Sequence, residues 1–466
     1  MMKTTWLSLG SLTLATSILA QSPATDPLSV VQRPRGADTE AHLSPSTQPY
    51  ASPHLDDAIK RGLTFLKDWQ SPNGSWDRLE NSDAMLSPDP HIPPPSLKPK
   101  DFGKLWHSGP YDGPVKDLAE SKDDVEHLAD TCLSTAAMLK AIGSGRQPEL
   151  AKSCSKAIDY VCKQVDLWNA DTILIQKRFL DPIHDSSSDV FRRPDLPVHP
   201  DSLEGLYYDP TVDTFFALRM LSEAKTRVTE PVLAAKIEKA IAILVRKIER
   251  SQDRSGKPDR TGTWLDETTP VLFIAHPPTF ATHCVAISSF SVAVRNGVTI
   301  KPEVLALAIK YFAKEPPQDR RELIYDQKHL ILATRYDLYL MRCYQLDQAK
   351  KPRSGQSTAT LKQLEQQLEA ERTALQKQIA ILVTEKIRCR GAALDCLPSL
   401  ILAVREFAPA EAPAFENKLT LALLSRQQHD GHFIAGTGTW GRGDNTFGTS
   451  TTLPTLILLA DRKKLP

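Results

Sequence analysis

The stretch that decides the fold is Gln70, Ser71, Pro72, Asn73, Gly74, Ser75 and Trp76. It follows a helical run with apolar residues at Leu63, Leu66 and Trp69. The frame Gln-x-x-x-Gly returns at Gln252 with Gly256, and at Gln427 with Gly431. Recurrence of one short frame along a whole chain is typical of a repeat architecture, in which each repeat is one small unit that packs against its neighbours.

Six segments are apolar on nearly every side, and each starts at a residue suited to a helix N-terminus. Such residues accept hydrogen bonds from the free amides of the first turn. Helices of this kind belong in the interior. Their predicted starts are near Asp130, Asp213, Thr282, Asp337, Asp395 and Ser450.

Six amphipathic segments alternate with them, each with one charged face and one apolar face, as expected of outer helices. Beyond residue 282 the predicted inner starts recur at intervals of 55 to 58 residues, about the length of one helical hairpin. The sequence therefore predicts an all-α fold, an (α/α)6 toroid of about six hairpins with inner and outer rings of helices. The predicted outer helices are residues 54–70, 148–164, 231–252, 302–314, 358–387 and 413–428.

The predicted helix at about 358–387 is longer and more charged than the others. Its leucines, among them Leu361, Leu368 and Leu375, have a partly heptad spacing, which allows a short coiled coil. The alternative is an outer helix that projects past the ring with its Gln and Glu face in solvent.

The first part of the chain has the pattern of an export signal. Residues 1–20 contain Lys3, a short apolar stretch and Ala20, which predicts a secretory signal peptide. Residues 21–53, rich in Pro, Ser, Thr and Gln, predict a disordered leader, and the toroid is expected over 54–466. We therefore expect an exported protein, periplasmic or extracellular, with no transmembrane helix after signal cleavage.

Composition narrows the classes of partner. Lys and Arg number 57 against 56 Asp and Glu, and loss of Lys3 with the signal peptide would leave the two signs in balance. This balance argues against a nucleic-acid partner. The seven cysteines are irregularly spaced and indicate no disulfide framework, so we expect them to act as small buried apolar residues.

The complete Gln70 to Trp76 motif, together with the Asp-Thr starts of inner helices, resembles the repeat of squalene and hopene cyclases and, more loosely, of protein prenyltransferase β subunits. The resemblance covers most of the chain after about residue 54. The other copies depart from the pattern, since Phe433 stands where Trp belongs and Trp264 is displaced. The resemblance implies that the motif is structural: the Gln amide and the Trp ring tie an outer helix to the loop that follows.

Long inserts indicate where a site should lie. They occupy roughly residues 77–129, 165–212 and 254–281, and each joins an outer helix to the next inner one, so all are expected at one end of the ring. Inner-helix N-termini meet at that end, and their partial positive charge favours anionic or oxygen-rich ligands.

The resemblance suggests two chemistries. The Asp-x-Asp-Asp acid of the cyclases is absent, which argues against ordinary cyclase activity. The prenyltransferases bind zinc through Asp-x-Cys and a His, and Asp130, Cys132 and His283 are the candidate ligands here. Because inner helices one and three of a six-membered ring are not neighbours, the more economical interpretation is no cofactor, with Asp130 capping a helix and Cys132 packed inside it.

Polysaccharide cleavage also occurs on α/α toroids and needs two carboxylates with aromatic platforms. Tyr207, Tyr208 and Asp209, followed by Asp213, are candidate binding residues, and Asp326 follows Tyr325 in the same way. The alternative is that Asp213 caps a helix and that the tyrosines anchor a loop.

The sequence leaves the presence of enzyme activity open, with Asp130, Asp213 and His283 as catalytic candidates. The hypothesis it favours is non-catalytic binding of a hydrophobic (lipid or isoprenoid) ligand, a glycan, or a protein partner at the cell envelope. The alternative is an enzyme on the same scaffold, either cyclase- or prenyltransferase-like or polysaccharide-degrading.

Overall fold

The computed structural model describes residues 52–76, 128–167, 212–257, 261–264, 280–313, 324–351, 358–385, 393–433 and 445–461. In these ranges the regular structure is helical, with 12 α-helices and no strand, which confirms the all-α prediction. Every described residue belongs to one compact unit, Pro45–Pro466. The predicted signal peptide and nearly all of the predicted leader lie outside the described residues.

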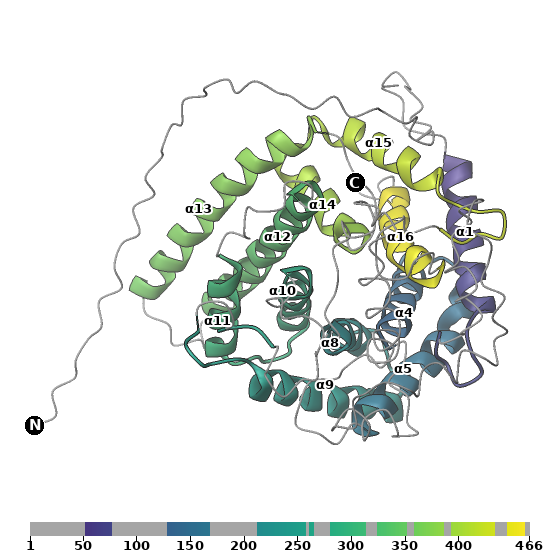
Figure 1. The fold of residues 1–466 in the computed structure, drawn as a ribbon, viewed down its shortest axis with the longest axis horizontal. Helices are drawn as coiled ribbons and strands as arrows, with labels where there is room; N and C mark the ends of the chain where they lie inside the picture. The colour runs from purple at the N-terminus through teal and green to yellow at the C-terminus, as the bar shows by residue number, and fades with distance from the viewer. Residues whose placement is uncertain are drawn as a thin grey trace, which may run out of the picture. The chain divides into compact units, whose positions relative to one another are not determined.

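Six helices, here called the core helices, form the interior. Each packs against the next in chain order, and the last, α16, packs against the first, α4, so the series of contacts closes on itself. Figure 1 shows them at the centre of this unit. They are α4 (Leu128–Gly143), α8 (Val212–Lys225), α10 (Phe280–Arg295), α12 (Ile324–Ala349), α14 (Ala393–Phe407) and α16 (Asn445–Ala460).

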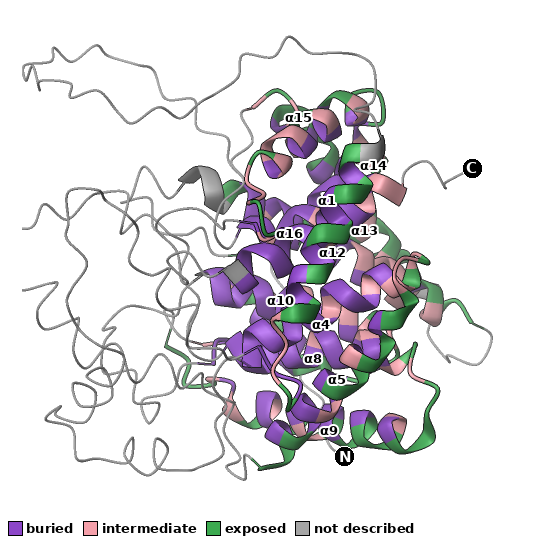
Figure 2. Cartoon of the chain, turned by 90° about the vertical axis from the view of Figure 1, so that its right-hand side faces the viewer, coloured by how far each residue is buried: buried purple, intermediate pink, exposed green. Residues whose placement is uncertain are grey.

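Six flanking helices alternate with them along the chain and lie outside them (Figure 1). In α9 one face is buried, through Ile237, Ile241, Leu244 and Ile248, and Figure 2 shows exposed residues along the opposite sides of α5 and α9. This is the pattern of helices that cover a core on one side. They are α1 (Ser52–Asp68), α5 (Ala151–Leu167), α9 (Pro231–Ser251), α11 (Pro302–Phe312), α13 (Thr358–Leu382) and α15 (Ala412–Leu424).

The flanking helices fall close to their predicted ranges, but two core helices, α12 and α16, begin earlier than predicted. Asp130 and Asp213 lie in the first turns of α4 and α8, as predicted. Asp337 was predicted to start a helix, and this is wrong, because α12 begins at Ile324 and continues through it. Asp337 is therefore a buried acid in a helix interior. Ser450 likewise lies inside α16, which begins at Asn445.

Helix α13 packs against α12 and α14. In its C-terminal half Leu375, Ile379 and Leu382 are buried in the core, while Leu361 and Leu364 nearer its start are partly exposed. The leucines in the C-terminal half of α13 therefore pack against other helices of this chain, as expected of an outer helix.

The repeated glutamine joins consecutive flanking helices. The Gln70 side-chain amide, just after α1, donates to the carbonyl oxygens of Gly74 and of Ser153 in α5, both at 3.0 Å. Gln252, just after α9, donates to Val304 in α11 at 2.9 Å and to Gly262 at 3.3 Å. The indole nitrogens of the two tryptophans donate back to their own flanking helices, Trp76 to Leu66 at 2.7 Å and Trp264 to Ile248 at 2.9 Å. These contacts agree with a structural role for the motif.

The middle copy of the motif uses a different glycine from the predicted one. Gly74 has φ 103° and Gly262 has φ 99°, and a Cβ at either would overlap a carbonyl of the next flanking helix, Lys156 or Leu307. Gly256 has φ 80°, but a Cβ there would meet nothing within 4 Å. Gly262 therefore takes the place assigned to Gly256, because extra residues lengthen this copy between the glutamine and the glycine.

Candidate functional site

A salt bridge crosses the centre of the core helices. The Arg219 guanidinium on α8 donates to both carboxylate oxygens of Asp395 on α14, at 2.8 and 2.6 Å. In the closed series of core helices, α8 and α14 are three places apart, so the pair joins opposite members. Both side chains are mostly buried, at 15% and 12% exposed, and the guanidinium carbon lies 5.0 Å from the centre of the Phe216 ring. A bidentate pair of this kind fixes both distance and orientation.

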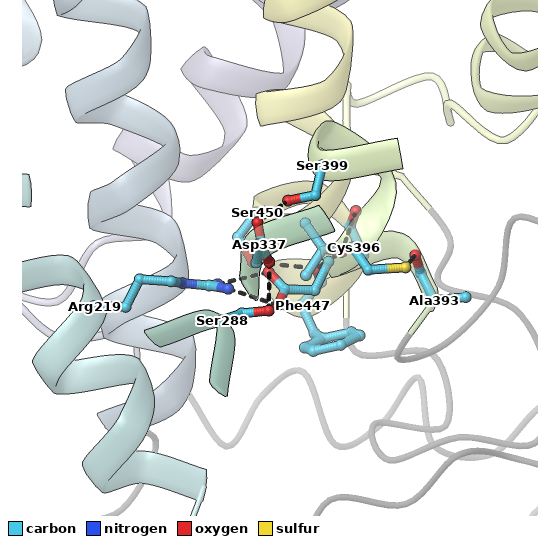
Figure 3. Close-up of polar contacts among 11 residues, drawn as sticks. Arg219, Ser288, Asp337, Ala393, Cys396, Ser399, Phe447 and Ser450 are labelled. Atoms are coloured by element: carbon cyan, nitrogen blue, oxygen red, sulfur yellow. Dashed lines mark hydrogen bonds and ion pairs between the residues drawn. The ribbon is translucent and has the colours of Figure 1, made fainter. Parts of the chain in front are cut away.

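Beside this pair, a buried acid connects three core helices. Asp337 on α12 accepts hydrogen bonds from Ser288 of α10 at 2.5 Å and from Ser399 of α14 at 2.8 Å. Ser291, also on α10, donates to the Asp337 main-chain oxygen at 2.6 Å. Burial raises the pKa of the Asp337 carboxyl, although the two serines, Arg295 and Arg219 act in the opposite direction. Figure 3 shows Arg219 extending toward Asp337 and Ser288.

Two sequence candidates for catalysis, Asp130 and Asp213, act on the buried thiol of Cys132. The pKa of the Cys132 thiol on α4 is raised first by burial and then by the Asp213 carboxylate, with Asp130 contributing and Arg219 opposing. Asp130, Asp213 and Arg219 therefore all influence the Cys132 thiol. We call Arg219, Asp395, Asp337, Ser288 and Ser399 the polar centre, and Asp130, Cys132 and Asp213 its N-terminal rim.

His283 faces another way. Its Nε2 lies 2.8 Å from the Ala308 carbonyl of α11, so this nitrogen carries a proton, and its ring packs against Trp264 and Tyr311. It is directed at a flanking helix, and α8 separates α10 from α4 in the core series. The structure therefore does not gather His283 with Asp130 and Cys132. Within the described ranges, no group of three or more His, Cys, Asp or Glu residues is placed to hold a metal ion.

The remaining binding candidates cannot be placed. Tyr207, Tyr208 and Asp209 lie outside the described residues, and the side chains of Tyr325 and Asp326 at the start of α12 are likewise not described.

Sequence reasoning missed most of the polar centre. Arg219 and Ser288 were passed over as parts of apolar helices, and Asp395 was assigned only a capping role. The available signal was a charged residue inside an otherwise apolar segment, as in the run from Phe215 to Leu221 around Arg219. Ionisable groups almost never lie in such places unless they are paired.

Comparison of the chain with protein-family models, with curated proteins and with solved structures gives no match. Among the described helices, none combines the length and the apolar character needed to cross a bilayer.

Proposed function

We propose that the chain is an exported α/α toroid of the squalene cyclase-like type that binds an oxygen-rich ligand, of the glycan class, at the cell envelope without transforming it. The closed series of contacts among the six core helices, with six flanking helices outside them, supports the toroid. The apolar N-terminal segment after Lys3 supports export.

The direction of the helices supports the placement of the site. Each core helix except the last described one, α16, is followed by a flanking helix after a short connection, such as residues 226–230 or 408–411. The return connections are longer in most hairpins, and the longest are residues 69–127 and 168–211. A consistent alternation of this kind directs the core-helix N-termini to one end. Their partial positive charges favour ligands with many oxygen atoms.

The polar centre is the observation that carries the choice of ligand. An isoprenoid needs a long apolar pocket, whereas the middle of these helices holds the Arg219–Asp395 pair and the Asp337 carboxyl with its two serines. An apolar chain inserted there would remove water from ionised and hydrogen-bonding groups without replacing their partners, which is costly. A glycan presents hydroxyl groups to the same surroundings.

Calorimetric titration tests this choice. The probes are soluble oligomers of glucose and of N-acetylglucosamine, with farnesol as the apolar comparison. We expect heat of binding with at least one oligomer, none with farnesol, and unchanged oligomer lengths after long incubation. Asp213→Asn, in the first turn of α8, should weaken binding, while Glu223→Gln, further along that helix, should not. Binding of farnesol alone would overturn the choice of ligand, and shortened oligomers would show an enzyme.

Native mass spectrometry of the protein purified from its own envelope is an independent check. A bound polyprenyl mass or a zinc ion at unit stoichiometry would contradict the proposal. A mature N-terminus near residue 21 would support export.

A further inference from the structure

Asp337 lies where three core helices meet. Its carboxyl does not cap a helix N-terminus, where an acid usually accepts hydrogen bonds from free backbone amides. It lies well inside α12, away from the free amides of the first turn. Each carboxylate oxygen is bound by a serine from a different helix, Oδ2 by Ser288 of α10 and Oδ1 by Ser399 of α14. The side chain therefore links α10, α12 and α14.

Two arginines act on this carboxyl, but among the described residues neither forms a salt bridge with it. The cations that influence it are Arg295 on α10 and Arg219 on α8, and Arg219 is already engaged by Asp395. The charge of Asp337 also raises the pKa of the buried thiols of Cys284 on α10 and Cys396 on α14. Within the described residues Asp337 itself forms no salt bridge.

Several polar groups on α12 and on the flanking helix α13 bind other partners. The Tyr336 hydroxyl donates to Glu406 of α14 at 2.9 Å. Helix α13 also packs against α12, but its acids Glu365 and Glu371 pair with Lys350 and Arg342 toward the C-terminal end of α12. An ionised Asp337 would therefore be a buried negative charge held mainly by two hydroxyl groups.

We propose that Asp337 is a proton-controlled clamp that holds α10, α12 and α14 together when protonated and loosens them when ionised. The protonated carboxyl donates its O–H to one serine, which turns its own hydroxyl to the carbonyl one helical turn back, and accepts from the other serine. On ionisation the proton passes to solvent, and the remaining charge draws water or cations toward the centre of the helices. The inference does not depend on the nature of the ligand proposed above.

The sign of the effect follows from burial. A carboxyl whose pKa is higher in the folded chain than in the unfolded chain binds more protons when folded. The stability it supports is present at low pH and is lost as the pH rises from its unfolded pKa through its folded pKa. The dependence is opposite to that of an acid in a salt bridge, such as Asp159, whose pKa is lowered by Lys163 and Lys236 despite the opposing effect of burial.

The test compares the wild-type protein with Asp337→Asn between pH 5 and pH 8.5. The amide keeps the shape and can hydrogen-bond both serines, but it cannot ionise. We expect the wild-type Tm to fall with rising pH by roughly 2–4 °C more than that of the variant. Asp57→Asn on α1, where the acid side chain is 62% exposed, should keep the wild-type slope. An unchanged slope in Asp337→Asn would overturn the proposal.

Hydrogen exchange of the wild-type protein gives a second readout that does not require the variant to fold. After correction for intrinsic rates, we expect the opening of α10, α12 and α14 to rise about tenfold between pH 5 and pH 8.5. Opening of α4 and α16 should change less. An increase spread evenly over all core helices would contradict a clamp at Asp337. Ser288→Ala with Ser399→Ala removes two donors to the carboxylate, so the transition should move to higher pH.

Discussion

The side-chain amide of Gln427 donates to the backbone carbonyl of Ala58 at 2.8 Å, and so joins the segment after the last flanking helix to the first. The same amide donates to Gly431 at 3.0 Å, and its oxygen accepts from Arg61 at 2.5 Å. These contacts repeat at the end of the chain what Gln70 does at its beginning. The motif therefore connects α15 to α1 by the device that connects α1 to α5.

Replacing Gln427 should weaken this closure. Gln427→Ala leaves the carbonyls of Ala58 and Gly431 without their donor, and we expect a loss of about 1–3 kcal/mol in the free energy of unfolding, measured by urea denaturation. Gln428→Ala is the matched control, because among the described residues the Gln428 side-chain amide bonds only to the nearby Arg426 carbonyl; it should cost under about 0.5 kcal/mol. Equal losses in the two variants would show that Gln427 has no special role.

A pair of glycine substitutions tests which residue completes the middle motif. At Gly262 an alanine would combine a positive φ with overlap of the Leu307 carbonyl, so Gly262→Ala should cost roughly 3 kcal/mol or more. At Gly256 only the backbone conformation opposes the change, and Gly256→Ala should cost about 1–2 kcal/mol. The free energies of unfolding of the two variants are compared by urea denaturation. A larger loss for Gly256→Ala would show that Gly256 completes the motif, as predicted from the sequence.

Local sequence signals were sufficient for the helices and insufficient for the polar centre. The apolar face of α9 from Ile237 to Ile248 is a periodic pattern, so both its existence and its buried side could be predicted. At Asp337, an acid followed by an apolar run has the sequence pattern of a helix start. The residues before it are also helical, so the helix continues through this position. The partners that make its burial tolerable, Ser288 and Ser399, are 49 and 62 residues away and are brought to it only by packing.

An insertion and a long-range ion pair account for the other differences between the predicted and the observed structure. Extra residues between Gln252 and Gly262 conceal the motif from a fixed spacing, although the hydrogen bonds preserve it. Arg219 and Asp395 are 176 residues apart, and nothing in either local segment identifies the other as its partner.

Cysteine labelling should follow burial. Burial raises the pKa of Cys154, Cys162 and Cys284 to about 12, so at pH 8 only about one thiol in ten thousand is ionised. We expect iodoacetamide to modify the half-buried Cys343 before the buried cysteines of the described residues, as measured by peptide mass mapping. Cys132 should react only after denaturation in guanidinium. Rapid labelling of native Cys132 would instead indicate an accessible, activated thiol on the N-terminal rim.

The Arg219–Asp395 pair should be strongly coupled, and a double-mutant cycle measures that coupling. Arg219→Met or Asp395→Leu alone leaves one charge mostly buried without its partner, and each should cost about 3–5 kcal/mol in the free energy of unfolding. The double variant should lose less than the sum of the two, since no isolated charge remains.

The control cycle uses Lys239 and Asp166, whose nitrogen and oxygen are also close, at 2.7 Å, but whose side chains are 63% and 53% exposed. Water and salt screen that pair, so its coupling should lie between about 0 and 1 kcal/mol. If the Arg219–Asp395 coupling were as small as this, the guanidinium would be hydrated in solution. The pair would then contribute little to holding α8 and α14 together.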